Sequence, residues 1–314
     1  MQKRTLGATG IEVSALALGT WGLSGEGYGP VAESEQDSVI DRALALGVTL
    51  FETADSYAAG GMEKRLGARL PAGEKVAVAT KIGTDYDAAI PRKRFDKPFL
   101  KESAQRSRER LKRDRIDVLL LHNPSSEAVV RGEATEALAE LVEEGVARTW
   151  GVSVATPTAA TAALIRDAPV LEIPHNAFHT TELFMIQELV KDKKTAILAR
   201  SVLAYGLLCG GWPVSKEFAA DDHRSERWHG DELRQRITQL NALRPSVVGS
   251  VSSLRAVALR YVLANPAISC AVVGPRRATQ LVELVRDAGK DPTFMTEEQV
   301  QMLEMRVRNV GVRL

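Results

Sequence analysis

The chain has 314 residues, and its 41 Lys and Arg against 40 Asp and Glu leave a formal net charge of only +1. This balance gives no electrostatic reason to expect nucleic acid or an anionic membrane as a partner. Apolar residues make up 45 % of the chain, as in ordinary globular proteins. No apolar run approaches the roughly 18 residues that a membrane-spanning helix needs.

The cysteine content and the N-terminal segment predict a cytoplasmic protein. Cys209 and Cys270 are the two cysteines, and they are too far apart in the sequence to suggest a disulfide framework or a metal motif. The first ten residues, MQKRTLGATG, lack the apolar region of a secretory signal. The sequence says nothing about the oligomeric state.

The chain opens with two short β segments and then alternates between strands and helices. Residues 4–13 predict a hairpin with a glycine-containing turn, and ALALGTWG predicts a strand that runs into a glycine-rich loop. A helical stripe over 34–46 ends at Gly47 and leads to the strand VTLFE. The later predicted strands are 76–81, 116–121, 147–153, 170–173, 195–200 and 268–274. The later predicted helices are 62–70, 99–113, 133–144, 157–166, 181–190, 231–242, 251–264 and 277–288.

Eight strand-then-helix units predict an α/β fold with a parallel sheet. The strands are near-continuous apolar runs, as is typical of strands buried on both faces. We therefore expect residues 1–314 to form a single (β/α)8 TIM barrel domain with a short N-terminal hairpin and extra C-terminal helices. A doubly wound open sheet is the alternative topology. The segment LGTWGLSGEG does not fit the G-x-G-x-x-G spacing of such a sheet, which favours the barrel.

Four chemically complementary side chains follow successive predicted strands. Glu52 and Tyr57 follow the second strand, Lys81 ends the third and His122 ends the fourth. In a barrel the active site lies at these carboxyl ends, so the four side chains are expected to face one cavity. Taken singly, Lys81 is most simply a solvated charge, His122 a structural histidine and Glu52 a charge at a helix start. Together they indicate catalysis.

The four groups suit the reduction of a carbonyl. A phenol is a poor acid at neutral pH, and a neighbouring ammonium is expected to lower the pKa of Tyr57. Glu52 is expected to hold Lys81 in place, and His122 to orient the carbonyl oxygen.

The chain resembles the aldo-keto reductase family from about Leu6 to its last predicted helix. The segments that carry the resemblance are FETADSY, VAVATKIG, LLLHNP, GVS, ARSVLAYGLL, DDHR and VVGPRRATQ. The resemblance implies a (β/α)8 barrel that reduces aldehydes and ketones with NADPH, using an Asp, Tyr, Lys and His tetrad. These positions fall on Glu52, Tyr57, Lys81 and His122, so a longer carboxylate replaces the family's Asp. A small displacement of Lys81 would be costly in rate.

The resemblance also implies a set of cofactor ligands. Near the nicotinamide, Ser153 is kept, while Val154, Glu172 and His175 replace the family's Asn, Gln and stacking Tyr. The pyrophosphate loop is implied at Ser201, Leu203 and Gly206. The site of the adenosine phosphate and its surroundings is implied at Gly274, Arg276, Arg277, Gln280 and Glu283, with Leu284 in place of the family's Asn.

Arginines at a helix start oppose the helix dipole, and an anionic ligand would explain them. Trp21, Tyr28 and Trp212 lie in loops after strands and are candidates for an apolar substrate pocket, although packing under long loops explains them equally well. His175 and His179 lie four residues apart, but no third ligand accompanies them, and we predict no metal site.

The sequence thus predicts an NADPH-dependent reductase of a small aldehyde or ketone, with Tyr57 as the proton donor. Two alternatives stay open. The substitutions at Val154, Glu172 and His175 are also compatible with a barrel that carries out non-redox acid–base chemistry such as elimination or isomerisation, or with a cofactor-binding sensor subunit. The fold alone does not decide among them, and the substrate is not predicted.

Overall fold

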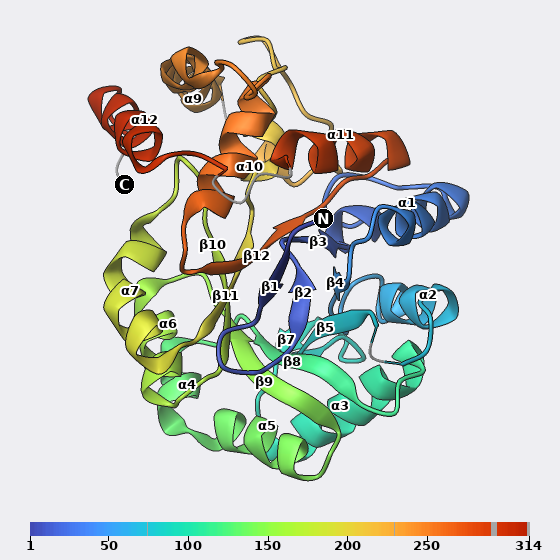
Figure 1. Ribbon diagram of the computed structural model, residues 1–314. Helices are drawn as coiled ribbons and strands as arrows, with labels where there is room; N and C mark the ends of the chain where they lie inside the picture. The colour runs from blue at the N-terminus through green and yellow to red at the C-terminus, as the bar shows by residue number, and fades with distance from the viewer. Residues whose placement is uncertain (74, 229, 290–293, 313–314) are drawn as a thin grey trace.

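The computed structural model describes residues 1–73, 75–228, 230–289 and 294–312. Eight parallel strands form a closed barrel in the order β3-β4-β5-β8-β9-β10-β11-β12, with β12 pairing back to β3, so the predicted TIM barrel is confirmed (Figure 1). The barrel strands are β3 Leu16–Gly19, β4 Leu50–Glu52, β5 Ala77–Ile82, β8 Ile116–His122, β9 Ala147–Ser153, β10 Val170–Pro174, β11 Ala196–Arg200 and β12 Ile268–Val273.

Each barrel strand is followed by a helix, as the alternation in the sequence predicts. These helices are α1 Glu33–Ala45, α2 Gly61–Arg69, α3 Lys97–Leu111, α5 Glu133–Glu143, α6 Pro157–Ile165, α7 Thr181–Lys193, α10 Leu254–Ala264 and α11 Ala278–Ala288. The remaining elements are the strands β1 Lys3–Thr5, β2 Glu12–Ser14, β6 Thr84–Asp85 and β7 Arg92–Lys93, the helices α4 Ser126–Arg131, α8 Arg224–Arg227, α9 Gly230–Leu240 and α12 Glu297–Asn309, and the 3-10 helices η1 Trp21–Leu23, η2 Ala204–Cys209 and η3 Asn241–Ser246.

Local capping chemistry sets several helix starts. Thr156 accepts a hydrogen bond from the Ala159 amide at 3.3 Å, and Pro157 occupies the first turn of α6, as the Thr-Pro pair predicts. The helix α12, which no segment in the chain-order prediction names, begins with a capping box between Thr296 and Gln299.

The N-terminal hairpin closes one end of the barrel. Strands β1 and β2 pair with Lys3 opposite Ser14, and in Figure 1 this dark blue hairpin lies in front of the ring of strands. Leu6, Ile11 and Val13 of the hairpin are buried in one apolar cluster with the residues that fill the barrel. The groups that carry chemistry must therefore lie at the opposite end.

The strands approach one another closely where the sequence supplies a small residue. A side chain at Gly151 on β9 would place its Cβ 2.1 Å from the carbonyl oxygen of Val170 on β10. Gly151 therefore lets the two backbones meet just before Ser153, the last residue of β9.

Candidate active site

A cavity of about 760 Å³ lies at the carboxyl ends of the barrel strands. All four predicted catalytic residues line it: Glu52, Tyr57, Lys81 and His122. The predicted cofactor residues that line it are Ser153, Glu172, Ser201, Leu203, Gly206, Gly274, Arg276, Gln280 and Glu283. Arg277 is exposed and does not line the cavity. Trp21 and Tyr28, the two candidates for a substrate pocket, also line the cavity.

A buried lysine lies between two buried carboxylates at the base of the cavity. The Lys81 ammonium contacts the Glu52 carboxylate directly and lies 3.5 Å from Oε2 of Glu172. Its Nζ also donates to the carbonyl oxygen of Thr53 at 3.2 Å. Burial lowers the pKa of Lys81 to about 8, and the charge of Glu172 opposes that shift. The longer Glu52 side chain therefore still reaches Lys81.

Tyr57 and His122 face one another beside this lysine. Their rings meet edge to face with centroids 5.9 Å apart, and Nζ of Lys81 lies 5.1 Å from the centroid of the Tyr57 ring. Burial, followed by the charge of Glu172, raises the pKa of Tyr57 above its ordinary value. The sequence-based expectation of a lowered Tyr57 pKa was wrong for this arrangement, because desolvation and the charge of Glu172 outweigh the nearby positive charge.

His122 is held in its neutral form. Burial lowers its pKa well below the ordinary value, and the charges of Lys93, Lys81 and Arg200 act in the same direction. Its Nδ1 lies 3.5 Å from the Ser56 hydroxyl oxygen. A hydroxyl that donates to Nδ1 leaves Nε2–H as a hydrogen-bond donor toward the cavity.

The residues next to this cluster fit a nicotinamide carboxamide. Ser153 donates its hydroxyl hydrogen to Oε2 of Glu172 at 2.5 Å. The other oxygen, Oε1, is buried and has no hydrogen-bond partner among the described residues. A carboxamide NH2 group is the kind of donor that such an oxygen requires. Val154 is 1 % exposed and does not line the cavity, so its side chain is not available to a ligand there.

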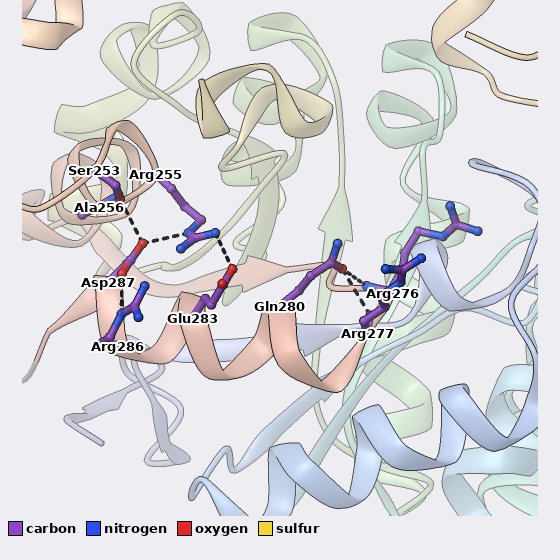
Figure 2. Close-up of polar contacts among 9 residues, drawn as sticks. All are labelled: Ser253, Arg255, Ala256, Arg276, Arg277, Gln280, Glu283, Arg286 and Asp287. Atoms are coloured by element: carbon purple, nitrogen blue, oxygen red, sulfur yellow. Dashed lines mark hydrogen bonds and ion pairs between the residues drawn. The ribbon is translucent and has the colours of Figure 1, made fainter. Parts of the chain in front are cut away.

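At the β12–α11 end, the polar residues already bind one another. Gln280 Oε1 accepts from the amides of Arg276 and Arg277 at 2.8 and 3.2 Å (Figure 2). Arg255 donates to Glu283 and to Asp287, each at 2.7 Å, and Figure 2 shows the three side chains meeting across α10 and α11. The family-matching residues here therefore form part of the internal framework.

The Arg276 guanidinium points to a loop of the chain itself. Its Nη2 donates to the carbonyl oxygens of Gly29 and Pro30 at 2.8 and 2.9 Å. Nε is buried without a hydrogen-bond partner among the described residues. An anionic phosphate would have to compete with two neutral carbonyls, which are weaker acceptors than charged oxygens.

Two aromatic candidates from the sequence lie outside the cavity wall. His175 is 2 % exposed and stacks on Tyr261 with centroids 6.0 Å apart, so it does not take the place of a ring-stacking tyrosine. Trp212 packs edge-on against Phe218 and Trp228, as expected under a long loop. His179 pairs with Glu182 at 2.7 Å instead of pointing with His175 to a common ligand.

Sequence reasoning missed several charged groups that line the cavity. Arg200 ends β11, and Arg224 and Arg227 lie in α8 with His223 just before them. Arg200 has the signal that identified Lys81 and His122, since it too stands at the carboxyl end of a barrel strand. For the α8 residues the sequence contained only a weak indication, because they reach the cavity through the long, irregular segment between β11 and α10 and not at the end of a barrel strand.

The barrel and its cluster of carboxylate, tyrosine, lysine and histidine define an oxidoreductase of the aldo/keto reductase class. The family model described as "Aldo/keto reductase family" matches residues 15–304, and the chain belongs to this family. The family's members are NAD(P)-dependent oxidoreductases that act on carbonyl compounds, and this protein is an oxidoreductase of the same kind.

The chain is similar to Aldo-keto reductase YhdN of Bacillus subtilis, with 28 % identity over 308 residues that cover 95 % of this chain and 92 % of that one. It is 30 % identical over 299 residues to L-galactose dehydrogenase of Arabidopsis thaliana, covering 91 % and 87 % of the two chains. The holo form of aldo-keto reductase AKR11C1 from Bacillus halodurans aligns with a TM-score of 0.81 and 25 % identity over 98 % of this chain and 96 % of that one.

The glycerol dehydrogenase AKR11B4 of Gluconobacter oxydans shares the fold, with a TM-score of 0.85 at 24 % identity over 99 % of this chain and 97 % of that one.

Within the described residues, no helix is long and apolar enough to cross a membrane.

Proposed function

We propose that the protein reduces an aldehyde or ketone to an alcohol with NADPH, and that Tyr57 is the proton donor. One observation carries the proposal: Glu52 contacts Lys81, and this pair lines the same cavity as Tyr57 and His122, whose rings meet edge to face. The residues proposed to hold the cofactor are Ser153, Glu172, Ser201, Leu203, Gly206, Gly274, Arg276, Arg277, Gln280 and Glu283.

A bound nicotinamide supplies the hydride, and the chain supplies orientation and the proton. His122 is neutral and donates Nε2–H to the carbonyl oxygen, which polarises the carbonyl and fixes its direction. The raised pKa keeps Tyr57 protonated, so its proton is retained until the carbonyl oxygen becomes a strongly basic alkoxide. The ammonium of Lys81 then stabilises the phenolate, and Glu52 holds Lys81 in place.

The experiment is a measurement of NADPH and NADH oxidation with a panel of aldehydes and ketones, in which the alcohol product is quantified. Steady oxidation that matches alcohol formation, with NADPH preferred, supports the proposal. Tight NADPH binding without oxidation by any carbonyl would overturn it. Conversion of a substrate without net coenzyme consumption would instead support the non-redox alternative.

A further inference from the structure

The loop that carries Tyr57 continues through three consecutive residues in the left-handed conformation. Ala58, Ala59 and Gly60 have φ angles of 51°, 48° and 81°. Glycine adopts this conformation freely, whereas the Cβ of an alanine crowds its own backbone there, so the two alanines are strained. Both alanines are exposed, so burial of their side chains does not impose the conformation. Strain of this kind persists only where other contacts hold the backbone.

The amide of Ala58 is bound by a carboxylate from a different loop. The Ala58 N–H donates to Oε1 of Glu26 at 3.1 Å. Among the described residues, this is the one side-chain hydrogen bond to the backbone of residues 57–61. The neighbouring amides donate to carbonyl oxygens within residues 54–58, and these amides belong to Tyr57, Ala59, Gly61 and Met62. Glu26 therefore connects this turn to another part of the barrel.

The loop that carries Glu26 is itself anchored across the cavity. Glu26 lies between η1 and α1, and it lines the cavity together with Tyr57. The next residue, Gly27, accepts from the His223 amide at 2.9 Å, and Tyr28 forms a β-bridge with Asp222. The carboxylate of Glu26 thus extends from a fixed loop, and a bond from an N–H to a carboxylate is of the stronger, charge-assisted kind.

We propose that Glu26 is a positioning residue for carbonyl reduction, because its bond to the Ala58 amide holds the strained turn and thereby places the Tyr57 hydroxyl. This proposal rests on the proposed reduction with Tyr57 as the proton donor. A small displacement of a proton donor is costly in rate. The competing explanation is electrostatic: burial and then the charge of Glu172 raise the pKa of Tyr57, and the charge of Glu26 adds to that shift.

The first test separates the hydrogen-bond acceptor from the charge. Glu26→Ala removes both, whereas Glu26→Gln keeps an oxygen acceptor and removes the charge. With a carbonyl that the wild type reduces, Glu26→Ala should lower kcat about tenfold and leave KM for the carbonyl and for NADPH within about threefold. Glu26→Gln should recover most of the lost kcat. An equal loss of kcat in both variants would assign the effect to the charge, and a loss confined to KM would assign Glu26 to substrate binding. Either result would overturn the proposal.

The second test is a rescue at the strained residue. Ala58→Gly should restore kcat of the Glu26→Ala variant by about threefold or more, because glycine adopts the positive φ without strain. Lys112→Gly is the matched control, since Lys112 is an exposed residue with φ of 52° that ends α3 and lies outside the cavity wall. Lys112→Gly should not restore kcat. Failure of Ala58→Gly to restore kcat, or equal recovery with both glycine variants, would contradict the proposal.

A structural measurement keeps the proposal independent of turnover. Crystal structures of the wild type and of Glu26→Ala should show that the variant moves Ala58 out of the left-handed region or displaces the Tyr57 hydroxyl from His122. An unchanged turn and an unchanged hydroxyl position would overturn the positioning role even if carbonyls are reduced. If the wild type reduces no carbonyl, the proposed reduction fails, whereas a displaced hydroxyl in Glu26→Ala would still show that Glu26 positions Tyr57.

Discussion

The two ends of the cavity use polar groups in opposite ways. At the chemical end, Lys81 and Glu52 are 2 % and 4 % exposed and bind one another, which leaves the Tyr57 phenol and the His122 ring facing the cavity. At the α11 end, Arg276 and Glu283 are more exposed and are bound to other parts of the chain. One end is organised toward a ligand, and the other is organised toward its own loops and helices.

This difference teaches that a residue can match the family's pattern while its hydrogen-bonding groups are already used within the protein and are not free to bind a ligand. Electrostatic interactions are strong where water is excluded, so the chemical end gains most from fixed charges. A coenzyme phosphate bound at the α11 end, as proposed, would have to displace existing hydrogen bonds, and only the difference between the old and new bonds would contribute to its affinity.

The largest expected effect is at Tyr57. Tyr57→Phe removes the transferable proton and keeps the ring, so kcat for carbonyl reduction should fall by about 10²–10⁴-fold. Cofactor affinity, measured by fluorescence titration, should stay within a few-fold. Turnover like that of the wild type would show that Tyr57 is not the acid, and the chemical end would then need a different proton donor.

Two buried aspartates, Asp55 and Asp287, allow the pH dependence of stability to be compared between the two regions. Burial, followed by the charge of Glu63, raises the pKa of Asp55 to about 7, against the attraction of Lys93 and Arg110. A raised carboxyl pKa means that the folded state binds the proton more tightly, so this contribution to stability is lost as pH rises from the unfolded pKa of about 4 to about 7. The free energy of unfolding of Asp55→Asn should therefore exceed that of the wild type by roughly a few kcal/mol at about pH 8. At about pH 5 the difference between the two proteins should be smaller.

Asp287 is the matched control at the other end. Burial would raise its pKa, but hydrogen bonds from Arg255, Ser253 and Arg286 outweigh burial and lower it. Its stabilising contribution is present above the unfolded pKa and is lost only in acid, so Asp287→Asn should destabilise the protein at both pH values. Denaturant unfolding curves give the comparison. The same pH slope in wild type and Asp55→Asn would contradict the assignment.

Coenzyme choice tests whether the α11 end binds a phosphate despite its internal bonds. Replacing Arg276 and Arg277 with Ala should weaken NADPH binding about 10–100-fold and leave NADH within a few-fold, because charge-assisted bonds to a phosphate are the strong kind. The single variants sharpen the comparison, since Arg276 must first leave Gly29 and Pro30 and the exposed Arg277 need not. Equal losses for both coenzymes would contradict the phosphate assignment.

The smallest expected effect concerns the redox state of the cofactor. At the proposed nicotinamide site, the carboxylate of Glu172 would favour a cationic, oxidised ring by opposite charge, and Val154 would offer the carboxamide no polar side chain. Val154→Asn with Glu172→Gln should therefore tighten NADPH several-fold more than NADP⁺, and raise reductase turnover. Separate titrations with the two redox forms measure this near neutral pH. An equal change in both affinities would refute the electrostatic explanation.

The fold was predictable because periodicity and burial are local signals. Apolar runs such as VLLL mark buried strands, and two adjacent residues, Thr156 and Pro157, are enough to mark a helix start. The grouping of Tyr57, Lys81 and His122 followed from the barrel topology alone, since strand ends converge. The helix α12 escaped the chain-order prediction because its amphipathic pattern follows a segment with no clear strand in front of it.

The direction in which a side chain points was not predictable. His175 packs inward on Tyr261, and Arg276 turns to Gly29 and Pro30, because distant segments provide those partners. The pKa of Tyr57 was predicted in the wrong direction for the same reason. The barrel topology indicates that Lys81 is near Tyr57, whereas desolvation depends on every element around the phenol.

The closure of the barrel between β3 and β12 has a consequence for synthesis on the ribosome. Leu16 pairs with Ala271, and Arg4 donates to the carbonyl oxygens of Leu263 and Ile268 at 2.7 Å. The strand β3 therefore cannot form its pairing with β12 until the ribosome has synthesised some 250 further residues. Until then β3 has an open edge of the kind that invites pairing with other chains, so nascent chains that stop before Ile268 are expected to depend on chaperones.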